Sequence, residues 1–576
     1  MLQSPDMFLL HEPIDPNVRE ALREFDDLTA ALLARRGITS REQAAAFLDP
    51  SYDDHVGDPL QILDMPKAAA RIARAIESNE RITVWSDYDC DGIPGGVILH
   101  DFLQKTGANF TNYIPHRHEE GFGVNVSGVE KLAYEGTTLL ITVDCGITDN
   151  EAIARATELG IDVIVTDHHL PGEMLPNAYA IIDPKARTEE TYPFKEFCGA
   201  GLAWKLVCGV LAHGFAGRDD IPLGWEKWLL DMAGFATIAD MVPLIGENRV
   251  IAKYGLLVMR KSPRLGLQML AKVARVNQRF ITEEDVGFML APRVNAASRM
   301  GNPRDAFELF TTDSETRAET LAKELEKANR SRRATAAAIT RAAHERIAER
   351  GELPAVIALG DPDWRPGLLG LVANTLAEEF ERPVFLWGRE GGMTLKGSCR
   401  AGVPHVSVIE LMERANETFV QFGGHRASGG FTLIDEAVFT LEERLCAAYA
   451  SLPERSPIEE TRADAELSTT EATNELLKRL SRLAPFGMGN EKPVFALRGV
   501  RLSNVAWFGK AEEHIKLTLT TDGFDSLDAI SFYAKRELGP SVKSLAAGKL
   551  VNILAYLERD QFTRGRPVRL RLVAIH

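Results

Sequence analysis

The sequence predicts an α/β protein with a parallel-sheet domain, a long connecting helix, a second α/β domain and a C-terminal OB-like β-barrel. Between residues 81 and 182, short apolar runs alternate with helical stretches, which is the pattern of a parallel sheet covered by helices. Beyond residue 499 the pattern changes to short strands, which is typical of a small barrel. With 576 residues the chain is also too long for a single core.

The parallel sheet is expected to contain the apolar, β-branched runs Ile82–Trp85, Thr111–Ile114, Thr138–Val143, Ile161–Thr166 and Ala178–Ile182. Helical stretches lie between them, at Gly96–Lys105, Val126–Tyr134 and Asn150–Glu158. Ligands of such sheets bind beyond the carboxyl ends of the strands. The residues that follow each strand are therefore the first candidates for a site.

Acids and histidines follow three of these strands. They are Asp87, Asp89 and Asp91 after the first run, Asp144 after the third, and Asp167-His168-His169 after the fourth. Acids this close repel one another unless a cation lies between them, and hard divalent cations bind clustered carboxylates. The alternative is a set of polar loops in which each Asp caps a helix. Three such clusters at one sheet edge favour a metal site.

Two later segments add candidate residues. Asp240 lies in the apolar run 236–243, where an unpaired carboxylate is costly, so it is a further candidate ligand; a structural carboxylate at a helix end is the alternative. Arg293, Asn295 and Arg299 place two arginines and an amide near apolar residues, which suits anion binding, although surface arginines are the commoner case.

Helices are expected in two further regions. Residues from about 17 to 80 have helical character: Val18 to Arg36 contains neither Gly nor Pro, Thr39-Ser40-Arg41-Glu42 predicts a capping box, and Met65 to Ser78 forms another helix. A capping sequence at 312–315 begins a stretch without Gly or Pro up to Gly351. At about 1.5 Å per residue this helix spans roughly 55 Å and connects two domains.

A second α/β unit is expected to begin with the strand Ala355–Leu359. In it, Ser398 lies between glycine and cysteine and close to Lys396 and Arg400, a combination that can hold phosphate oxygens. The run Phe422-Gly423-Gly424-His425 follows. Each of these signals is weak by itself.

The C-terminal part begins with a charged linker, Pro453 to about Glu466. The barrel strands are predicted at Val500–Ser503, Ile515–Thr520, Asp528–Phe532, Leu550–Leu557 and Arg569–Ile575. The stretch from Arg559 to Arg571 is basic and includes Phe562, which suits contact with a nucleic-acid single strand. A solvated barrel face is nearly as good an interpretation.

Composition limits the class of protein. The net charge of −16, from 82 acids and 66 bases, argues against a protein that coats nucleic acid, but it leaves room for a local basic groove. The six cysteines show no zinc spacing, and the N-terminus lacks the design of a signal peptide. No apolar run has the length of a membrane span. We therefore expect a cytoplasmic protein with no membrane contact.

The four acid-bearing motifs resemble, in order, those of the DHH phosphoesterase family. They are Asp87-Tyr88-Asp89-Cys90-Asp91-Gly92, Thr142-Val143-Asp144, Asp167-His168-His169 and Thr237-Ile238-Ala239-Asp240. Within the family, the chain is most similar to the bacterial 5′→3′ single-stranded-DNA exonucleases, and the similarity extends over nearly its whole length. Further matching blocks are Arg117 with residues 119–123, Pro292–Ala296, Lys396–Arg400 and Phe422–His425.

The resemblance implies a DHH catalytic domain with two divalent metal ions, Mn²⁺ preferred or Mg²⁺. The implied ligands are Asp89, Asp91, Asp144, His168 and Asp240, with Asp87 as a ligand or a partner of one. It further implies that Asp144 bridges the metals, that His169 donates to the phosphate and that Asp167 orients a histidine.

The second domain, of DHHA1 type, is implied to fix the 5′ end of the DNA. The matching substrate-binding positions are Arg117, Phe122, Arg293, Asn295, Arg299, Lys396, Ser398, Arg400, Gly423, Gly424 and His425. The chain departs from the family pattern at Arg365, where histidine is usual, and at Asp183, where asparagine is usual. Neither departure removes an implied metal ligand.

The expected domains are a helical segment at 1–80, a catalytic domain at 81–311, a connecting helix at 312–350, a DHHA1-type domain at 351–452, and a linker with the barrel at 453–576. We expect a monomer that acts on single-stranded DNA in repair and recombination, with a helicase and a single-strand-binding protein as candidate partners. The alternatives are a phosphodiesterase for short oligonucleotides or cyclic dinucleotides, and a catalytically silent single-strand-binding scaffold.

Overall fold

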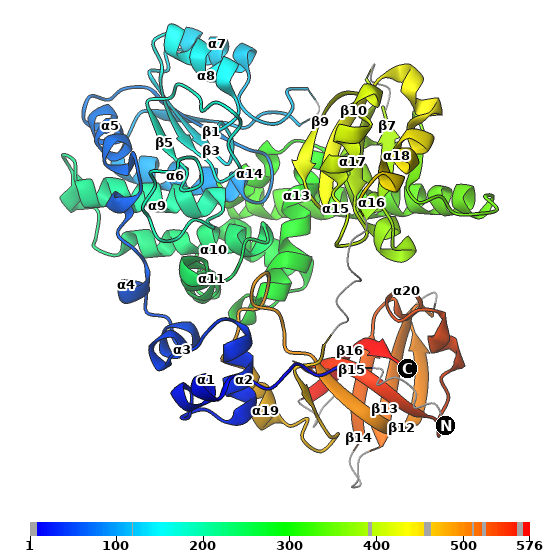
Figure 1. Cartoon of the computed structure of the whole chain (residues 1–576). Helices are drawn as coiled ribbons and strands as arrows, with labels where there is room; N and C mark the ends of the chain where they lie inside the picture. The colour runs from blue at the N-terminus through cyan, green and yellow to red at the C-terminus, as the bar shows by residue number, and fades with distance from the viewer. Residues whose placement is uncertain are drawn as a thin grey trace. The chain divides into compact units, whose positions relative to one another are not determined.

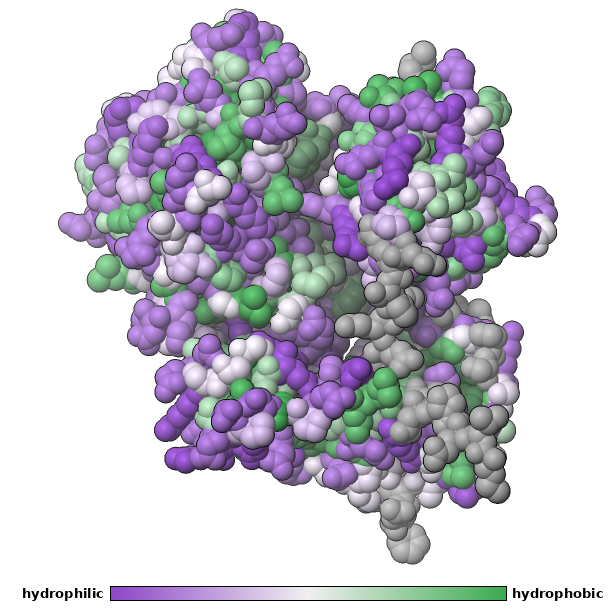
Figure 2. All heavy atoms as spheres, viewed as in Figure 1, coloured by the Kyte–Doolittle hydropathy of each residue, from purple (hydrophilic) through white to green (hydrophobic). Residues whose placement is uncertain are grey.

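The structure is a computed structural model that describes residues 8–117, 119–389, 394–453, 462–509, 512–520, 526–560 and 568–576. It divides into two compact units (Figure 1). The first comprises Met1–Glu326 and Thr461–His576, and the second comprises Lys327–Glu460. On the face shown in Figure 2, hydrophilic residues cover most of the surface of the described parts. Among the described residues, no helix combines the length and apolar character that a membrane crossing requires.

The first unit contains the predicted parallel sheet, which is confirmed in its strands and their direction. Its strands are β1 (Ile82–Ser86), β2 (Phe110–Tyr113), β3 (Leu139–Val143), β4 (Asp162–Thr166) and β5 (Ala180–Ile182). Their order is β2-β1-β3-β4-β5, and every pairing is parallel. All carboxyl ends therefore meet at one edge, where the acidic motifs begin.

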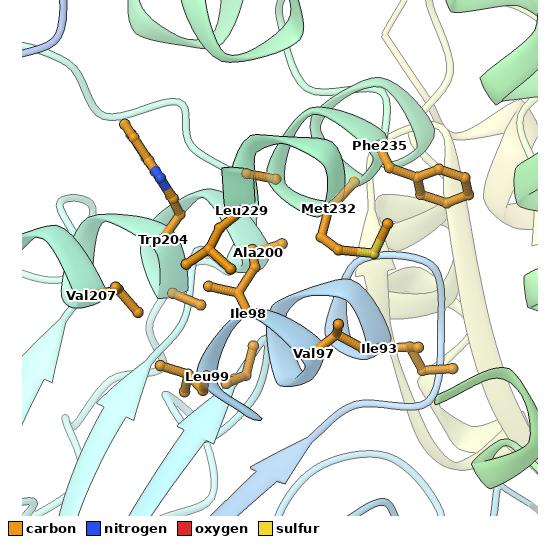
Figure 3. Packing of buried hydrophobic residues seen from close by; sticks show 14 of the residues in the cluster. Ile93, Val97, Ile98, Leu99, Ala200, Trp204, Val207, Leu229, Met232 and Phe235 are labelled. Atoms are coloured by element: carbon orange, nitrogen blue, oxygen red, sulfur yellow. The ribbon is translucent and has the colours of Figure 1, made fainter. Parts of the chain in front are cut away.

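Helices cover both faces of this sheet (Figure 1). On one face pack α5 (Met65–Glu77), α6 (Gly92–Thr106) and α9 (Gly199–His213), with α10 (Leu230–Ala239) behind them. Figure 3 shows Val97 and Ile98 of α6, Ala200 of α9 and Met232 of α10 as members of this apolar cluster. On the other face lie α7 (Val126–Tyr134) and α8 (Asn150–Glu158). Further helices of this unit are α4 (Tyr52–His55), α11 (Gly246–Met259), α12 (Leu265–Ala274), a π-helix (Asp285–Leu290), α13 (Ala291–Met300) and α14 (Arg304–Thr311).

The N-terminal helices differ from the prediction in two respects. The stretch from Val18 to Arg36 forms two helices, α1 (Pro16–Ala21) and α2 (Asp27–Arg35), because Asp26 caps a new helix by accepting from the Thr29 N–H at 3.2 Å. The capping box before α3 (Arg41–Leu48) is formed by Ser40 and Gln43, one residue later than predicted. These three helices pack on the barrel core, whereas α5 packs under the parallel sheet. Residues 1–80 thus contribute to two different cores.

The predicted OB-like barrel is present. Its strands are β12 (Phe495–Phe508), β13 (His514–Thr520), β14 (Ser526–Ser531), β15 (Leu550–Arg559) and β16 (Val568–Ile575), with a short β11 (Ala465–Glu466) beside β12. Pairing between β12 and β15 closes the barrel. The predicted strand at Val500–Ser503 was too short, because an irregularity between Leu497 and Val500 lets one long strand bend and pair with two neighbours. Helices α19 (Asn474–Ser481) and α20 (Ala534–Glu537) accompany the barrel.

The second unit has a mixed sheet in the order β6-β7-β8-β10-β9. Its strands are β6 (Ile357–Gly360), β7 (Val384–Gly388), β8 (Lys396–Arg400), β9 (Phe419–His425) and β10 (Ser428–Leu433). Helices α16 (Pro366–Phe380), α17 (Val408–Arg414) and α18 (Leu441–Ala450) complete it. The long helix α15 (Glu315–Ala348) has 34 residues and starts where Ser314 accepts from the Arg317 N–H. At about 1.5 Å per residue it spans roughly 51 Å.

The contact between α10 and α11 gives a prediction about stability. A Cβ built on Gly255 would lie 2.6 Å from the Gly234 Cα, so the two helices approach too closely for any side chain there. We expect Gly255→Leu to destabilise the first unit by about 3 kcal/mol because the buried helices must separate. Differential scanning calorimetry measures the loss. Gly351→Leu, where a Cβ meets open space, is the control, and equal effects in both variants would contradict the prediction.

Candidate metal centre

The three acids after β1 turn in different directions. The Oδ1 atom of Asp89 accepts from the N–H groups of Asp91 and Gly92 at 2.8 and 3.1 Å and so starts α6. A Cβ on Gly92 would lie 2.5 Å from the carbonyl oxygen of Asp87, so only glycine fits this turn. The carboxylate of Asp91 points toward α9 instead, where it accepts from the N–H groups of Gly199 and Ala200 at 2.6 and 2.8 Å. The side chains therefore stop alternating between the two faces of the sheet at this turn.

Asp144 follows β3 in a strained backbone conformation. Its φ of 61° is left-handed, which is uncommon for a residue other than glycine and is typical of functional positions. A Cβ on Gly199 would lie 2.6 Å from the Asp144 Cβ, so the first turn of α9 comes very close to this acid. The sequence analysis missed this role of α9. Its signal is the run Cys198-Gly199-Ala200-Gly201 at the start of an apolar helix.

The acids and histidines form three overlapping groups, and within each group the donor atoms lie within 4.8 Å of one another. The groups are Asp87, Asp89 and Asp144; Asp91, His168 and Asp240; and Asp144, His168 and His169. Asp144 and His168 each belong to two groups, and the His168 Nε2 lies 3.2 Å from the Asp144 Oδ1. The structure thus brings together every residue predicted as a metal ligand.

The electrostatics of this cluster require positive charge. Burial and the neighbouring acids raise the pKa of Asp87, Asp91 and Asp144, and they raise the pKa of Asp240 to about 9. The Asp87 Oδ1 atom is buried and has no hydrogen-bond partner among the described residues. Buried acids without partners are costly. The donor set of carboxylate oxygens and imidazole nitrogens fits Mn²⁺ or Mg²⁺, which would balance their charge.

The two histidines have different environments. Burial lowers the pKa of His168, with Asp91 opposing, so its imidazole is suited to bind a metal in the neutral form. Burial acts on His169 as well, but the hydrogen bond from its Nδ1 to Asp167 at 2.7 Å outweighs it and raises the pKa. Asp167, despite its burial, has a lowered pKa because His169 and the Ile147 N–H bind it. Asp167 thus favours the protonated form of His169.

Three predicted substrate-binding residues lie next to this cluster. The Asn295 side chain accepts from the Cys90 N–H at 3.1 Å and donates to its sulfur, which ties α13 to the acidic loop. Tyr88 stands between Asp87 and Asp89 in the acidic loop, and the Arg117 guanidinium lies 4.9 Å from the centre of its ring. Phe122, 52% exposed, packs edge-on against the His169 ring at 5.7 Å.

The two arginines of α13 differ in their contacts. Arg293 is buried, binds Glu326 at 2.7 Å and donates to the carbonyl of Met289. These contacts hold α13 against α15 and give no support to its predicted substrate-binding role. Burial raises the pKa of the Tyr88 hydroxyl, and the charges of Arg117 and Arg299 both act against this rise. Arg299 therefore lies near the acidic loop, as Arg117 does.

Five of the remaining predicted substrate-binding residues share one face of the second unit's sheet, whereas Gly424, opposite Gly429, belongs to the other face. Register across β10 puts Arg400, Ser428 and His425 in one row, and Ser398, Gly430 and Gly423 in the next. Lys396 continues the same face of β8. A Cβ on Gly424 would lie 2.5 Å from the Ser428 carbonyl oxygen, and its φ of 139° also requires glycine. These residues form a small, glycine-lined surface with cationic ends.

The barrel's basic stretch is only partly described. Phe562, Arg564 and Arg566 lie outside the described residues. Arg569 and Arg571 both contact Glu558, at 2.5 and 3.4 Å, so their charge is partly neutralised. The Arg571 guanidinium also lies 4.3 Å from the ring centre of Phe532, which belongs to an aromatic cluster. This cluster consists of Phe508, His514, Phe532 and Tyr533.

The chain matches three family models in order: the DHH family N-terminal domain over residues 81–234, the DHHA1 domain over 353–450 and the RecJ OB domain over 463–574. Together with the metal cluster, these domains define a DHH phosphoesterase. The chain is 34% identical over 577 residues to the single-stranded-DNA-specific exonuclease RecJ of Bacillus subtilis, covering 99% of this chain and 71% of the relative. It therefore belongs to the RecJ family.

Solved structures agree with this assignment. RecJ of Thermus thermophilus in complex with Mn²⁺ matches with a TM-score of 0.81 and 27% identity, covering all of this chain and 80% of that one. The Mg²⁺ complex matches with a TM-score of 0.74 and 26% identity, covering 97% and 76%. These relatives and the donor set confirm the prediction that Mn²⁺ or Mg²⁺ is the cofactor.

Removal of the metal tests the shared position of Asp144. We expect Mn²⁺ to raise the melting temperature of the wild type, since at 100 times its dissociation constant a ligand stabilises by about 2.7 kcal/mol. Asp144→Asn should lose most of this shift, because Asp144 belongs to two of the donor groups. Calorimetry with Mn²⁺ or with EDTA measures the shift. Asp219→Asn, an exposed acid, is the control; a full Mn²⁺ shift in Asp144→Asn would refute the assignment.

Proposed function

We propose that this protein hydrolyses phosphodiester bonds in single-stranded DNA from the 5′ end and releases 5′ mononucleotides. The observation that supports the hydrolysis most strongly is the set of three donor groups at the carboxyl edge of the sheet, which Asp144 and His168 join to one another. Two metal ions at such a site activate water and stabilise the charge that develops on the phosphate and the leaving oxygen. The single-strand preference is inferred from the RecJ relatives, which are single-stranded-DNA-specific exonucleases. The 5′ polarity is inferred from the family resemblance of the motifs.

Within this proposal the chain's own residues have separate tasks. The metals would be held by six side chains, those of Asp87, Asp89, Asp91, Asp144, His168 and Asp240. His169, whose protonated form Asp167 favours, donates to a phosphate oxygen and stabilises its charge in the transition state. Arg117 and Arg299 lie beside the acidic loop and offset its charge toward a polyanionic substrate.

The 5′ end is assigned to the second unit. We infer that Lys396, Ser398, Arg400 and His425 bind the terminal phosphate, since a glycine-lined surface with cationic ends admits backbone and side-chain donors together. The aromatic cluster of the barrel offers ring faces for stacking with unpaired bases. Stacking and phosphate contacts are insensitive to sequence, so the same surfaces accept any single strand.

We further propose that the protein acts in the cytoplasm as a monomer in DNA repair and recombination. A helicase that unwinds duplex DNA and a single-strand-binding protein are the partners that an exonuclease for single strands requires. Residues 81–311 and 351–452 are proposed as the catalytic and DHHA1-type domains, and the family models lie inside these limits.

Cleavage assays with Asp144→Ala test the hydrolysis. With Mn²⁺, the wild type should release 5′ mononucleotides from end-labelled single strands and leave duplex DNA, dinucleotides and cyclic dinucleotides largely intact. Asp144→Ala should lower the rate at least about 10³-fold, because loss of a shared ligand disturbs both donor groups, while single-strand binding survives. Substantial activity in Asp144→Ala would rule out the bridging role. A preference for dinucleotides would favour the phosphodiesterase alternative.

A second variant tests the charge on His169. Asp167→Asn should lower kcat about 10- to 100-fold, because the amide no longer stabilises the imidazolium or fixes the ring. Steady-state kinetics with a labelled single strand measure the change, and Asp219→Asn again serves as the control. Unchanged kcat in Asp167→Asn would remove His169 from the proposed donor role.

A further inference from the structure

The loop between β2 and α7 is held at both ends by carboxylates: Glu120, which lies in a block that matches the family, and Asp149, which lies in none of the motifs. It carries Arg117 and Phe122, which lie beside the acidic loop and His169. At its start, Glu120 accepts from the Tyr113 hydroxyl and, at 2.6 Å, from the His116 N–H. At its end, the Val124 N–H donates to the Asp149 Oδ2 at 2.7 Å.

Asp149 departs from the ordinary behaviour of an aspartate at its position. It immediately precedes α8, where an aspartate side chain usually accepts from a backbone N–H of the first helical turn. Here the side chain makes no such bond and reaches instead to a different loop. Burial raises its pKa to about 6, with Asp167 adding to the effect, so keeping this carboxylate ionised is costly. A local preference given up at a cost points to a functional constraint.

The neighbouring glycine adapts the loop to this contact. Gly123 has a φ of 85°, and a Cβ there would lie 2.6 Å from the Asp149 Oδ2. The backbone can therefore reach the carboxylate only without a side chain at this position. Gly123 directly follows Phe122, so the contact also determines where the Phe122 ring stands against His169.

Resting on the proposed function, we propose that Asp149 is a positioning residue for the DNA strand. It acts through the Val124 N–H and fixes Phe122 beside His169. The 52% exposed Phe122 ring presents a face on which a base or sugar next to the scissile phosphate can stack. We call the contact of Asp149 with the Val124 N–H, together with the Phe122 ring that it positions, the clamp. The β3–α8 loop connects the clamp to the metal cluster, because the Ile147 N–H in this loop donates to Asp167, the partner of His169.

Single-strand binding in the Asp144→Ala background tests the proposal without cleavage. Fluorescence anisotropy with a labelled, 5′-phosphorylated single strand gives Kd for additional Asp149→Ala, Phe122→Ala and double substitutions. We expect each single substitution to raise Kd at least about tenfold, and the double substitution to match them within about twofold, because both remove the same contact. Effects that multiply in the double variant, or an unchanged Kd, would overturn the proposal.

Three further variants separate positioning from stability. Asp149→Asn should restore binding to within about threefold, since the amide oxygen can still accept from the Val124 N–H. Gly123→Ala should reproduce the loss independently and replaces Asp149→Ala if that variant fails to fold. Asp26→Ala removes an ordinary helix cap and should lower stability without changing Kd. Absence of both the rescue and the Gly123→Ala effect would also defeat the proposal.

Cleavage by the same substitutions, made with Asp144 intact, separates this inference from the proposed function. If the wild type fails to cleave single strands with Mn²⁺, the proposed function is wrong, while the coupling of Asp149 and Phe122 in Kd still tests the clamp. If the wild type cleaves but the substitutions act independently, only the clamp is wrong.

Discussion

The mutual repulsion of buried carboxylates at one sheet edge is the constraint on which this structure depends. Parallel strands must end on the same side, so the acids that follow β1 and β3 are brought together by the topology itself. The fold then compensates locally. The N-terminus of α9 gives two N–H groups to Asp91, and the positive end of that helix lies toward the acids. A bound divalent cation would supply the remaining charge.

Environment assigns different tasks to chemically similar groups in this cluster. One oxygen of Asp89 accepts hydrogen bonds at the start of α6, and both oxygens of Asp91 accept from α9. One oxygen of Asp87 has no hydrogen-bond partner among the described residues. Asp87 is therefore at least as well suited to bind a metal as its two neighbours. The adjacent histidines diverge for the same reason, because only His169 reaches Asp167 through its ring.

Local patterns predicted the fold class and the ligand cluster because both depend on short runs. The helices at Val126–Tyr134 and Asn150–Glu158 were predicted to the residue, and each strand end carried its own signal. Partners distant in the sequence could not be predicted. Arg293 finds Glu326 on another helix, and Gly199 touches Asp144 across 55 positions. Nor does sequence reveal that the Asp149 side chain leaves its own helix for a different loop, since a capping role fits its position equally well.

The charge of the chain bears on how such a site holds DNA. A net charge of −16 repels a polyanion at long range, so binding has to come from short-range contacts. The arginines near Tyr88 provide local positive charge, to which bound metal ions would add, and the exposed ring of Phe122 provides contact that salt does not screen. Few phosphates are then neutralised, and affinity depends less on ionic strength than it does for a basic nucleic-acid-binding protein. Because rings stack only on bases that are free of a duplex, the same contacts that replace net charge also favour a single strand.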